Sequence, residues 1–175
     1  MGVLTNAGRA AMVRAVKEQS IYLALGTGDN EWGDTPPLED VESTGLINEI
    51  GRRALARSLY VTPDDENGTL EVPTSVTTDT NGTVNVTTQK YSVSETPTRH
   101  LYLEFALDFA DAANITIREL GVYIGCRLRA DVEPGRLFFT RSDFSDEGLL
   151  FQIENREPLL RKPDTRDTFT WVISI

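Results

Sequence analysis

The side chains that most often carry catalysis are scarce in this sequence. His100 is the only histidine and Cys126 is the only cysteine. A catalytic base or nucleophile needs a partner within hydrogen-bonding reach, and no nucleophile adjoins His100 in the sequence. Arg127 could lower the pKa of the thiol, but the position of Cys126 at the end of an apolar stretch favours a buried, inert side chain. We therefore expect structural roles for both residues.

Carboxylates are the more plentiful candidates, and they gather in predicted loops. None of these loops has the spacing of a twelve-residue calcium loop with its terminal glutamate. Glycoside hydrolysis needs two placed carboxylates, and Glu104 and Asp108 are the one pair with apolar neighbours. Because these two residues share a face of a predicted strand, we expect them to face solvent. The sequence predicts no catalytic site, no metal site and no cofactor.

Two opposite charges, Arg118 and Glu119, interrupt the most hydrophobic stretch of the chain, which reads "ANITIRELGVYIG" at residues 113–125. Apolar residues occupy odd positions before the pair and even positions after it. Because side chains alternate faces along a strand, this change indicates a broken strand or a β-bulge at the pair. The two charges form either a surface ion pair worth under about 1 kcal/mol or part of a buried polar network.

The bulk composition excludes several classes of protein. The net charge of the 175 residues is −10 and the pI is near 4.6, which disfavours binding to nucleic acid. No run of eighteen apolar residues occurs, so we expect no membrane insertion. The N-terminus lacks the apolar stretch and cleavage site of a signal peptide, and a single cysteine allows no intrachain disulfide.

The elements that would position these residues are a helix and a set of strands. Thr5 is a suitable N-cap for a helix over residues 6–18, and residues 43–51 resemble a second, short helix. The clearest strand covers 100–109, where every second residue is apolar, and another ends the sequence at 167–175. We therefore expect an α+β fold: a mainly antiparallel β-sheet with one or two N-terminal helices packed on it, in a single domain of residues 1–175.

Residues 74–98 differ from the rest because threonine is abundant and large apolar side chains are absent. Asn81-Gly82 stands between two alternating stretches, which predicts a hairpin with a type I′ turn. The strand after this turn carries Val84 and Val86. Such a hairpin has little to bury, so we expect a projecting β-hairpin insertion that acts as an arm.

The segment "GTGDNEWGDTPPLED" at residues 26–40 is predicted to be an acidic loop. Its apolar side chains either pack on the sheet as a lid or fill a pocket on a neighbouring subunit. The residues of this candidate subunit-contact loop are Gly26, Gly28, Trp32, Pro36 and Pro37.

The order of four segments resembles the N-terminal domain of phage tail-collar and tail-fibre proteins. These segments are "LTNAGRAAMVRA", "LALGTGDNEWGDTPP", "TGLINEIGRRAL" and "ITIRELGVYIG". The family has a helix that begins "LT-x-x-G", a glycine-rich strand end, an "L-x-N-E-x-x-R" helix and an "IREIGL"-like strand. The sequence departs from this pattern in having "GTGD" at the strand end and the Thr-rich insertion. The resemblance covers most of the chain.

Glu49 and Arg52, in the "NEIGR" segment, are the natural partners for the two charges at 118 and 119. We hypothesise the pairs Glu119–Arg52 and Arg118–Glu49. Together with Gly121, these residues form a candidate structural network that orients the glycine-rich loop or a subunit contact.

The resemblance implies a structural virion protein of a tailed virus, made in the host cytoplasm. It would be a baseplate or tail-fibre attachment component, an adaptor that docks on other tail proteins and on copies of itself in a ring or trimer. Fibre proteins of the family continue into a shaft and a receptor-binding tip, so the resemblance favours attachment to the tail. The alternative is a module that binds a host glycan or surface protein, and an enzyme is the third possibility.

Overall fold

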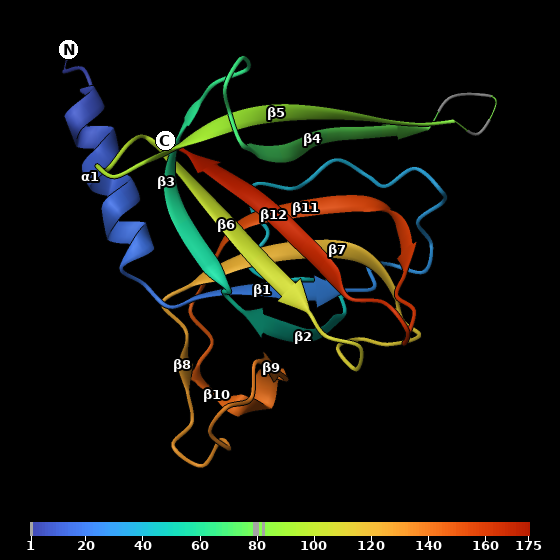
Figure 1. The fold of residues 1–175 in the computed structure, drawn as a ribbon. Coiled ribbons are helices and arrows are strands. Elements are labelled where there is room, and N and C mark those ends of the chain that lie inside the picture. The colour runs from blue at the N-terminus through green and yellow to red at the C-terminus, as the bar shows by residue number, and fades with distance from the viewer. Residues whose placement is uncertain (1, 79–80, 82) are drawn as a thin grey trace. The chain divides into compact units, whose positions relative to one another are not determined.

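The computed structural model describes residues 2–78, 81 and 83–175 (Figure 1). The chain forms two compact units. Unit 1 comprises Met1–Glu18, Arg57–Glu104 and Phe169–Ile175, and unit 2 comprises Gln19–Ala56 and Phe105–Thr168. Antiparallel strands dominate both units, and the described residues contain one α-helix. The predicted α+β class is confirmed.

Unit 1 contains one helix and a five-stranded sheet, two of whose strands continue into unit 2. The strand order in the sheet is β12-β6-β3-β5-β4 (Figure 1). The bounds of these elements are α1 Asn6–Lys17, β3 Arg57–Pro63, β4 Leu70–Thr78, β5 Val84–Ser94, β6 His100–Leu107 and β12 Asp167–Ser174.

Helix α1 begins where the sequence predicts it. The hydroxyl of Thr5 accepts a hydrogen bond from the backbone N–H of Gly8 at 3.1 Å, so Thr5 is the N-cap. Of the twelve helical residues, only Val13 and Val16 are buried. The ammonium group of Lys17 lies 4.2 Å from the centre of the Tyr60 ring on β3.

Strand β6 has the alternation that its sequence predicts. Its apolar face, at alternate positions from Leu101 to Leu107, is completely or almost completely buried. Strands β4 and β5 pair from Leu70↔Tyr91 to Thr78↔Val84. Gly82 lies outside the described residues, so the type I′ turn stays a prediction.

Unit 2 contains a second five-stranded antiparallel sheet, in the order β11-β7-β1-β2-β9, and a two-stranded sheet of β10 and β8. A short 3-10 helix, η1, covers Arg141–Asp143. The strands are β1 Ile21–Gly26, β2 Glu49–Ala54, β7 Thr116–Ile124, β8 Arg127–Leu128, β9 Phe138–Phe139, β10 Phe144–Asp146 and β11 Leu149–Leu160.

Strand β7 lies between β1 and β11, and it explains the change of apolar phase in the sequence. Its register with β1 is unbroken along the whole paired length. The irregularity lies in the ladder with β11, where extra residues follow Asn155, the partner of Glu119. The bulge therefore belongs to β11, and the bulge expected within β7 is wrong. Every residue from Glu119 to Tyr123 is buried, so both faces of this part of β7 are covered and both must avoid unpaired polar groups.

The predicted helix at residues 43–51 is not a helix. Residues up to 48 form turns and irregular backbone, and Glu49 begins β2, which pairs with β1 and β9. Gly51 lies where a Cβ atom would come within 2.7 Å of the Phe138 ring and of the Phe139 carbonyl oxygen. The close approach of β9 requires a glycine at this position of β2. The sequence alone suggests instead that Gly51 ends a helix.

Candidate functional site

The connection between β1 and β2 in unit 2, residues 27–48, is the candidate site and is called the β1–β2 loop below. The buried carboxylate of Glu119 on β7 holds both of its ends. Its Oε2 accepts from the N–H of Gly28 at 3.1 Å, and the N–H of Ile47 donates to Oε2 and Oε1 at 3.0 and 3.2 Å. Glu119 is 1% exposed. One side chain thus satisfies backbone donors that are nineteen residues apart in the loop.

Arg118, the next residue on β7, holds the first turn of the same loop. Its guanidinium donates to the carbonyl of Trp32 at 2.8 Å and to the carbonyl of Gly33. The guanidinium also lies 5.6 Å from the centre of the Trp32 ring. Because side chains alternate along β7, Arg118 and Glu119 leave the strand on opposite faces, yet both bind this loop.

Gly28 is where the loop leaves the sheet, and its conformation requires glycine. Its φ is +65°, and a Cβ atom there would lie 2.6 Å from the Trp32 ring and 3.2 Å from the Cβ of Arg118. The indole is half-buried over this glycine. Asn48 closes the base of the loop, since its side-chain N–H donates to the Gly28 carbonyl at 2.8 Å.

The middle of the β1–β2 loop is held by the bulged strand β11. The backbone N–H of Asn155 donates to the carboxylate of Glu39 at 3.1 Å, and its side-chain N–H donates to the carbonyl of Pro37 at 3.2 Å. The loop therefore has contacts to its own unit at its beginning, middle and end.

Between these anchor points, the loop presents apolar side chains to solvent. Leu38 is 92% exposed and Val41 is 95% exposed, and Ile47 and Pro37 are also exposed. The loop carries six acidic residues and no basic one. The exposed aliphatic side chains therefore lie among carboxylates, on a backbone that is held at several points.

The candidate network does not have the pairing that we hypothesised. Glu119 binds backbone N–H groups, and Arg118 binds backbone carbonyls, so the pairs Glu119–Arg52 and Arg118–Glu49 are wrong. Arg52 and Glu49 bind each other instead, with Nε–Oε1 and Nη2–Oε2 distances of 2.7 and 3.0 Å. Both residues lie on β2, where side chains three positions apart leave the strand on opposite faces. The long side chain of Arg52 must therefore fold over towards the carboxylate of Glu49 to bind it.

Arg52 is completely buried and is held on several sides. Its guanidinium lies 3.6 Å from the centre of the Tyr123 ring and donates to the Glu147 carbonyl at 2.6 Å. It also lies 3.5 Å from the sulfur of Cys126. This is a structural centre of unit 2, because no part of the buried guanidinium faces solvent.

Two further glycines of the predicted set lie at close contacts of the same sheet. A Cβ atom at Gly26 would lie 2.8 Å from the Glu119 carboxylate, and one at Gly121 would lie 2.9 Å from Leu150 and 3.0 Å from Leu46. Gly26 pairs with Glu119 across β1 and β7. The small size of Gly26 thus leaves room for the buried carboxylate.

The remaining chemistry-bearing residues have local partners. His100 Nδ1 lies 2.7 Å from the Ser174 hydroxyl, and among the described residues no carboxylate binds the other ring nitrogen. The thiol of Cys126 donates to the Glu147 carbonyl at 3.1 Å, and burial raises its pKa. Within the described part of the chain, no group of three or more metal-binding side chains occurs.

A second buried arginine was not predicted. Arg161 follows β11, is 1% exposed, and donates to the carbonyls of Asp108 and Asp111 and to the carboxylate of Asp167. Ala112 and Asn114 lie in the connection between β6 and β7, which also contains Asp108 and Asp111, and both have positive φ angles. Asp167 is one of many acidic residues in the sequence, and the carbonyl partners of Arg161 leave no pattern there, so only the structure identifies this site.

A family model described as "Baseplate wedge 3 tail fiber network component" matches residues 1–175. The chain therefore belongs to this family, and it is a structural component of the phage baseplate and tail. Its place is the virion tail. A search of curated proteins found no match. Across the residues that the structure describes, no helix has the length and apolar character needed to cross a membrane.

Proposed function

We propose that the protein is an adaptor of the baseplate's tail fibre network, and that it docks on a neighbouring tail protein through the β1–β2 loop. The observation that carries this proposal is the exposure of Leu38 and Val41 on a backbone held by Arg118, Glu119 and Asn155. A loop that is already ordered loses little conformational entropy when it binds.

The chemistry of the loop defines the partner surface. Six carboxylates without a basic residue need arginine or lysine opposite them, and two aliphatic side chains need an apolar pocket. The partner is therefore a protein surface with an apolar pocket rimmed by basic side chains. Because surface charge is screened by salt, the affinity falls as ionic strength rises.

The Thr-rich hairpin is proposed as a second contact. Strand β4 is at an edge of its sheet, and an edge strand offers unpaired backbone groups for strand addition by a neighbour. The proposed arm comprises residues 74–98 and includes Asn81, Val84 and Val86; Gly82, the other residue predicted for it, lies outside the described residues. Contacts of this kind between copies are compatible with a ring or trimer.

We also propose that the protein acts without catalysis and does not itself bind a host receptor. In support, the Ser174–His100 contact has no orienting carboxylate within the described residues. Glycan recognition uses exposed aromatic rings, whereas Trp32 is half-buried over Gly28 and the exposed ring of Phe109 is stacked by the Arg166 guanidinium at 4.6 Å. Binding of the isolated protein to a glycan array, or turnover of a cell-wall substrate, would contradict this proposal.

The docking test uses the purified baseplate proteins of the same virus. The double variant L38S/V41S removes the apolar contacts and leaves the anchors intact, so we expect its affinity for the cognate protein to fall by about a hundredfold. The matched control is L149S, at an exposed leucine that begins β11 and lies outside both proposed contacts. Equal binding by the double variant and the control would contradict docking through this loop.

A further inference from the structure

The most exposed part of the β1–β2 loop in unit 2 is a short segment that mixes apolar side chains with carboxylates. Leu38 and Val41 are 92 and 95% exposed, and Asp40 and Glu42, on either side of Val41, are exposed as well. The Asp40 carboxylate accepts a hydrogen bond from the backbone N–H of Glu42 at 2.9 Å, which fixes a local turn. A surface that receives this segment needs an apolar recess with hydrogen-bond donors beside it.

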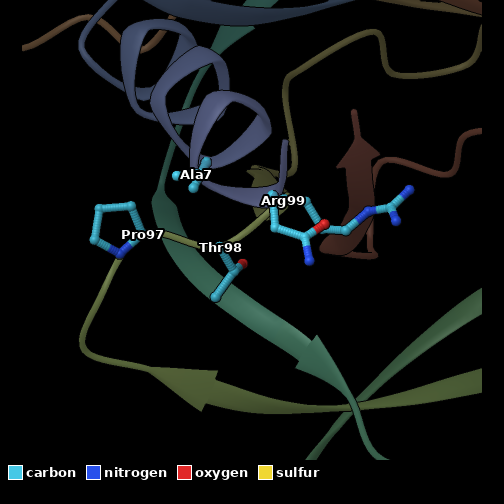
Figure 2. Close-up of a pocket in the computed structure, with 6 residues that line it drawn as sticks. Ala7, Pro97, Thr98 and Arg99 are labelled. Carbon is cyan, nitrogen blue, oxygen red and sulfur yellow. The ribbon is translucent and has the colours of Figure 1, made fainter. Parts of the chain in front are cut away.

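Unit 1 contains a recess of this kind, which is called the α1 hollow below. It lies between the first turns of α1 and the segment before β6, and its volume is about 450 Å³. Figure 2 shows Ala7 on the helix, with Pro97, Thr98 and Arg99 on the segment that passes beside it. The walls contributed by Ala7, Ala10 and Pro97 are apolar. The volume is larger than that of a leucine and a valine side chain together, so both can enter.

The polar groups of the α1 hollow are donors that are available to a carboxylate. Arg99 and Asn6 line it and are exposed, and within the described part of the chain their side chains have no ion-pair or hydrogen-bond partner. The Thr98 hydroxyl is already used, because it donates to the carbonyl of Val61 at 2.6 Å. The first turn of α1 contains no acidic residue, so a carboxylate here also meets the positive end of the helix dipole.

The distribution of charge along the chain favours the same pairing. The β1–β2 loop has six acidic residues and no basic one, whereas residues 2–18, which include α1, have three basic residues and one acidic one. That acidic residue, Glu18, follows the last turn of the helix and is paired with Arg14 at 2.9 Å. In a chain of net charge −10, two copies repel each other unless an acidic surface of one meets a basic surface of the other.

We propose that the partner of the β1–β2 loop is a second copy of this chain, and that its α1 hollow receives Leu38 and Val41. This inference rests on the proposed docking function of the loop and names the partner. Loop and hollow are both open to solvent within one chain, so each copy has one of each to offer. Such a contact is head-to-tail, and repetition of it gives a ring or an open chain of copies.

The first experiment measures mass by light scattering after size-exclusion chromatography, with the full chain at about 5–100 µM, a range that brackets micromolar affinity. We expect wild-type protein to exceed the monomer mass of 19.4 kDa, and to do so less as ionic strength rises. L38S/V41S is a monomer because the apolar contacts are lost. A7E is also a monomer, because its carboxylate faces the acidic loop of the partner and weakens the contact by at least about tenfold.

Two features keep this experiment interpretable. Glutamate in the first turn of a helix is favourable, so A7E retains its fold. The matched control is A15E, the same change at an exposed position two turns further along α1, and it self-associates like wild type.

The second experiment mixes the two defective variants. L38S/V41S keeps its hollow and A7E keeps its loop, so the loop of A7E can dock on the hollow of L38S/V41S. We expect an equimolar mixture to form a dimer of twice 19.4 kDa and nothing larger, because the remaining loop and the remaining hollow are both defective. Recovery of binding in the mixture also shows that both variants are folded.

The outcomes separate this inference from the proposed function. Wild-type protein that is monomeric at every concentration, A7E that self-associates like wild type, or a mixture that stays monomeric would each overturn the inference. If the wild type is monomeric and L38S/V41S loses binding to a different baseplate protein, the loop docks on that protein and only the inference fails. If L38S/V41S binds itself and every other baseplate protein as wild type does, docking through the loop fails as well.

Discussion

The anchoring of the β1–β2 loop by Glu119 predicts the result of removing this carboxylate. In Glu119→Ala, the N–H groups of Gly28 and Ile47 lose their acceptor inside the protein. A buried N–H without a partner costs about 1–3 kcal/mol, and truncation of a fully buried side chain leaves a cavity with its own cost. The two effects together predict a loss of about 3–6 kcal/mol in the free energy of unfolding of unit 2.

Glu119→Gln is the matched control. Its carbonyl oxygen can occupy the position of Oε2, which accepts from both N–H groups at 3.0 and 3.1 Å. It loses only the contact at Oε1, where the amide nitrogen would face the N–H of Ile47 at 3.2 Å. We expect a loss of about 1–2 kcal/mol for this variant.

The assays are urea unfolding and native-state hydrogen exchange at the amides of Gly28 and Ile47. A loss of about 3 kcal/mol at these anchors increases the exchange rate by about a hundredfold, since each 1.4 kcal/mol is a factor of ten. If Glu119→Ala is within about 0.5 kcal/mol of wild type and both amides stay protected, the carboxylate does not hold the loop and the reasoning is refuted.

Three further predictions concern the same unit. Gly28→Ala lowers the free energy of unfolding by about 1–3 kcal/mol, because φ is +65° and the new Cβ atom meets the Trp32 indole ring. The control, Gly33→Ala, is close to neutral in urea unfolding, because its Cβ atom meets nothing within 4 Å. Equal effects of the two changes would contradict this account. Arg52→Met lowers the free energy of unfolding by about 3–5 kcal/mol, because Glu49 is left buried without its partner. The added change Glu49→Leu restores much of this stability. A double variant that is no more stable than Arg52→Met would contradict this prediction. Burial raises the pKa of Glu154 above its ordinary value of 4.5. The stability that the protonated carboxyl contributes is therefore present below the unfolded-state pKa and is lost as the pH rises through the folded-state pKa. We expect Glu154→Gln to be more stable than wild type at about pH 7 but not at about pH 4, and an equal difference in stability at both pH values would contradict this.

The parts of the fold with a clear local pattern could be predicted. The N-cap of α1 could be predicted because the hydroxyl of Thr5 binds a backbone N–H only three residues further along the chain. The apolar alternation of β6 is visible in the sequence because one face of that strand is buried. Both signals depend on residues a few positions apart.

The parts decided by distant contacts could not be predicted. The sequence of β11, "LLFQIENREPLL", has no regular alternation and so predicts no strand, because the strand is half-buried and bulged. The last residues of the helix predicted at 43–51 belong to β2 instead, because pairing with β1 and β9 makes them a strand. Long-range pairing overrides weak local propensity in both cases.

The candidate network shows the same limit for side chains. The importance of Arg118 and Glu119 could be predicted from two charges in an apolar stretch. Their partners could not, because both side chains bind backbone groups of the β1–β2 loop, and any sequence offers such groups. Opposite charges in the sequence pointed to Glu49 and Arg52, which bind each other.

The central claim is that the β1–β2 loop docks on another protein of the baseplate, and a high-resolution map of the assembled virion baseplate tests it most directly. The account predicts that Leu38 and Val41, now 92 and 95% exposed, are buried in an apolar pocket of a neighbouring polypeptide with arginine or lysine at its rim. A map in which both side chains remain in solvent, with the chain held in the particle by other surfaces, would contradict the account.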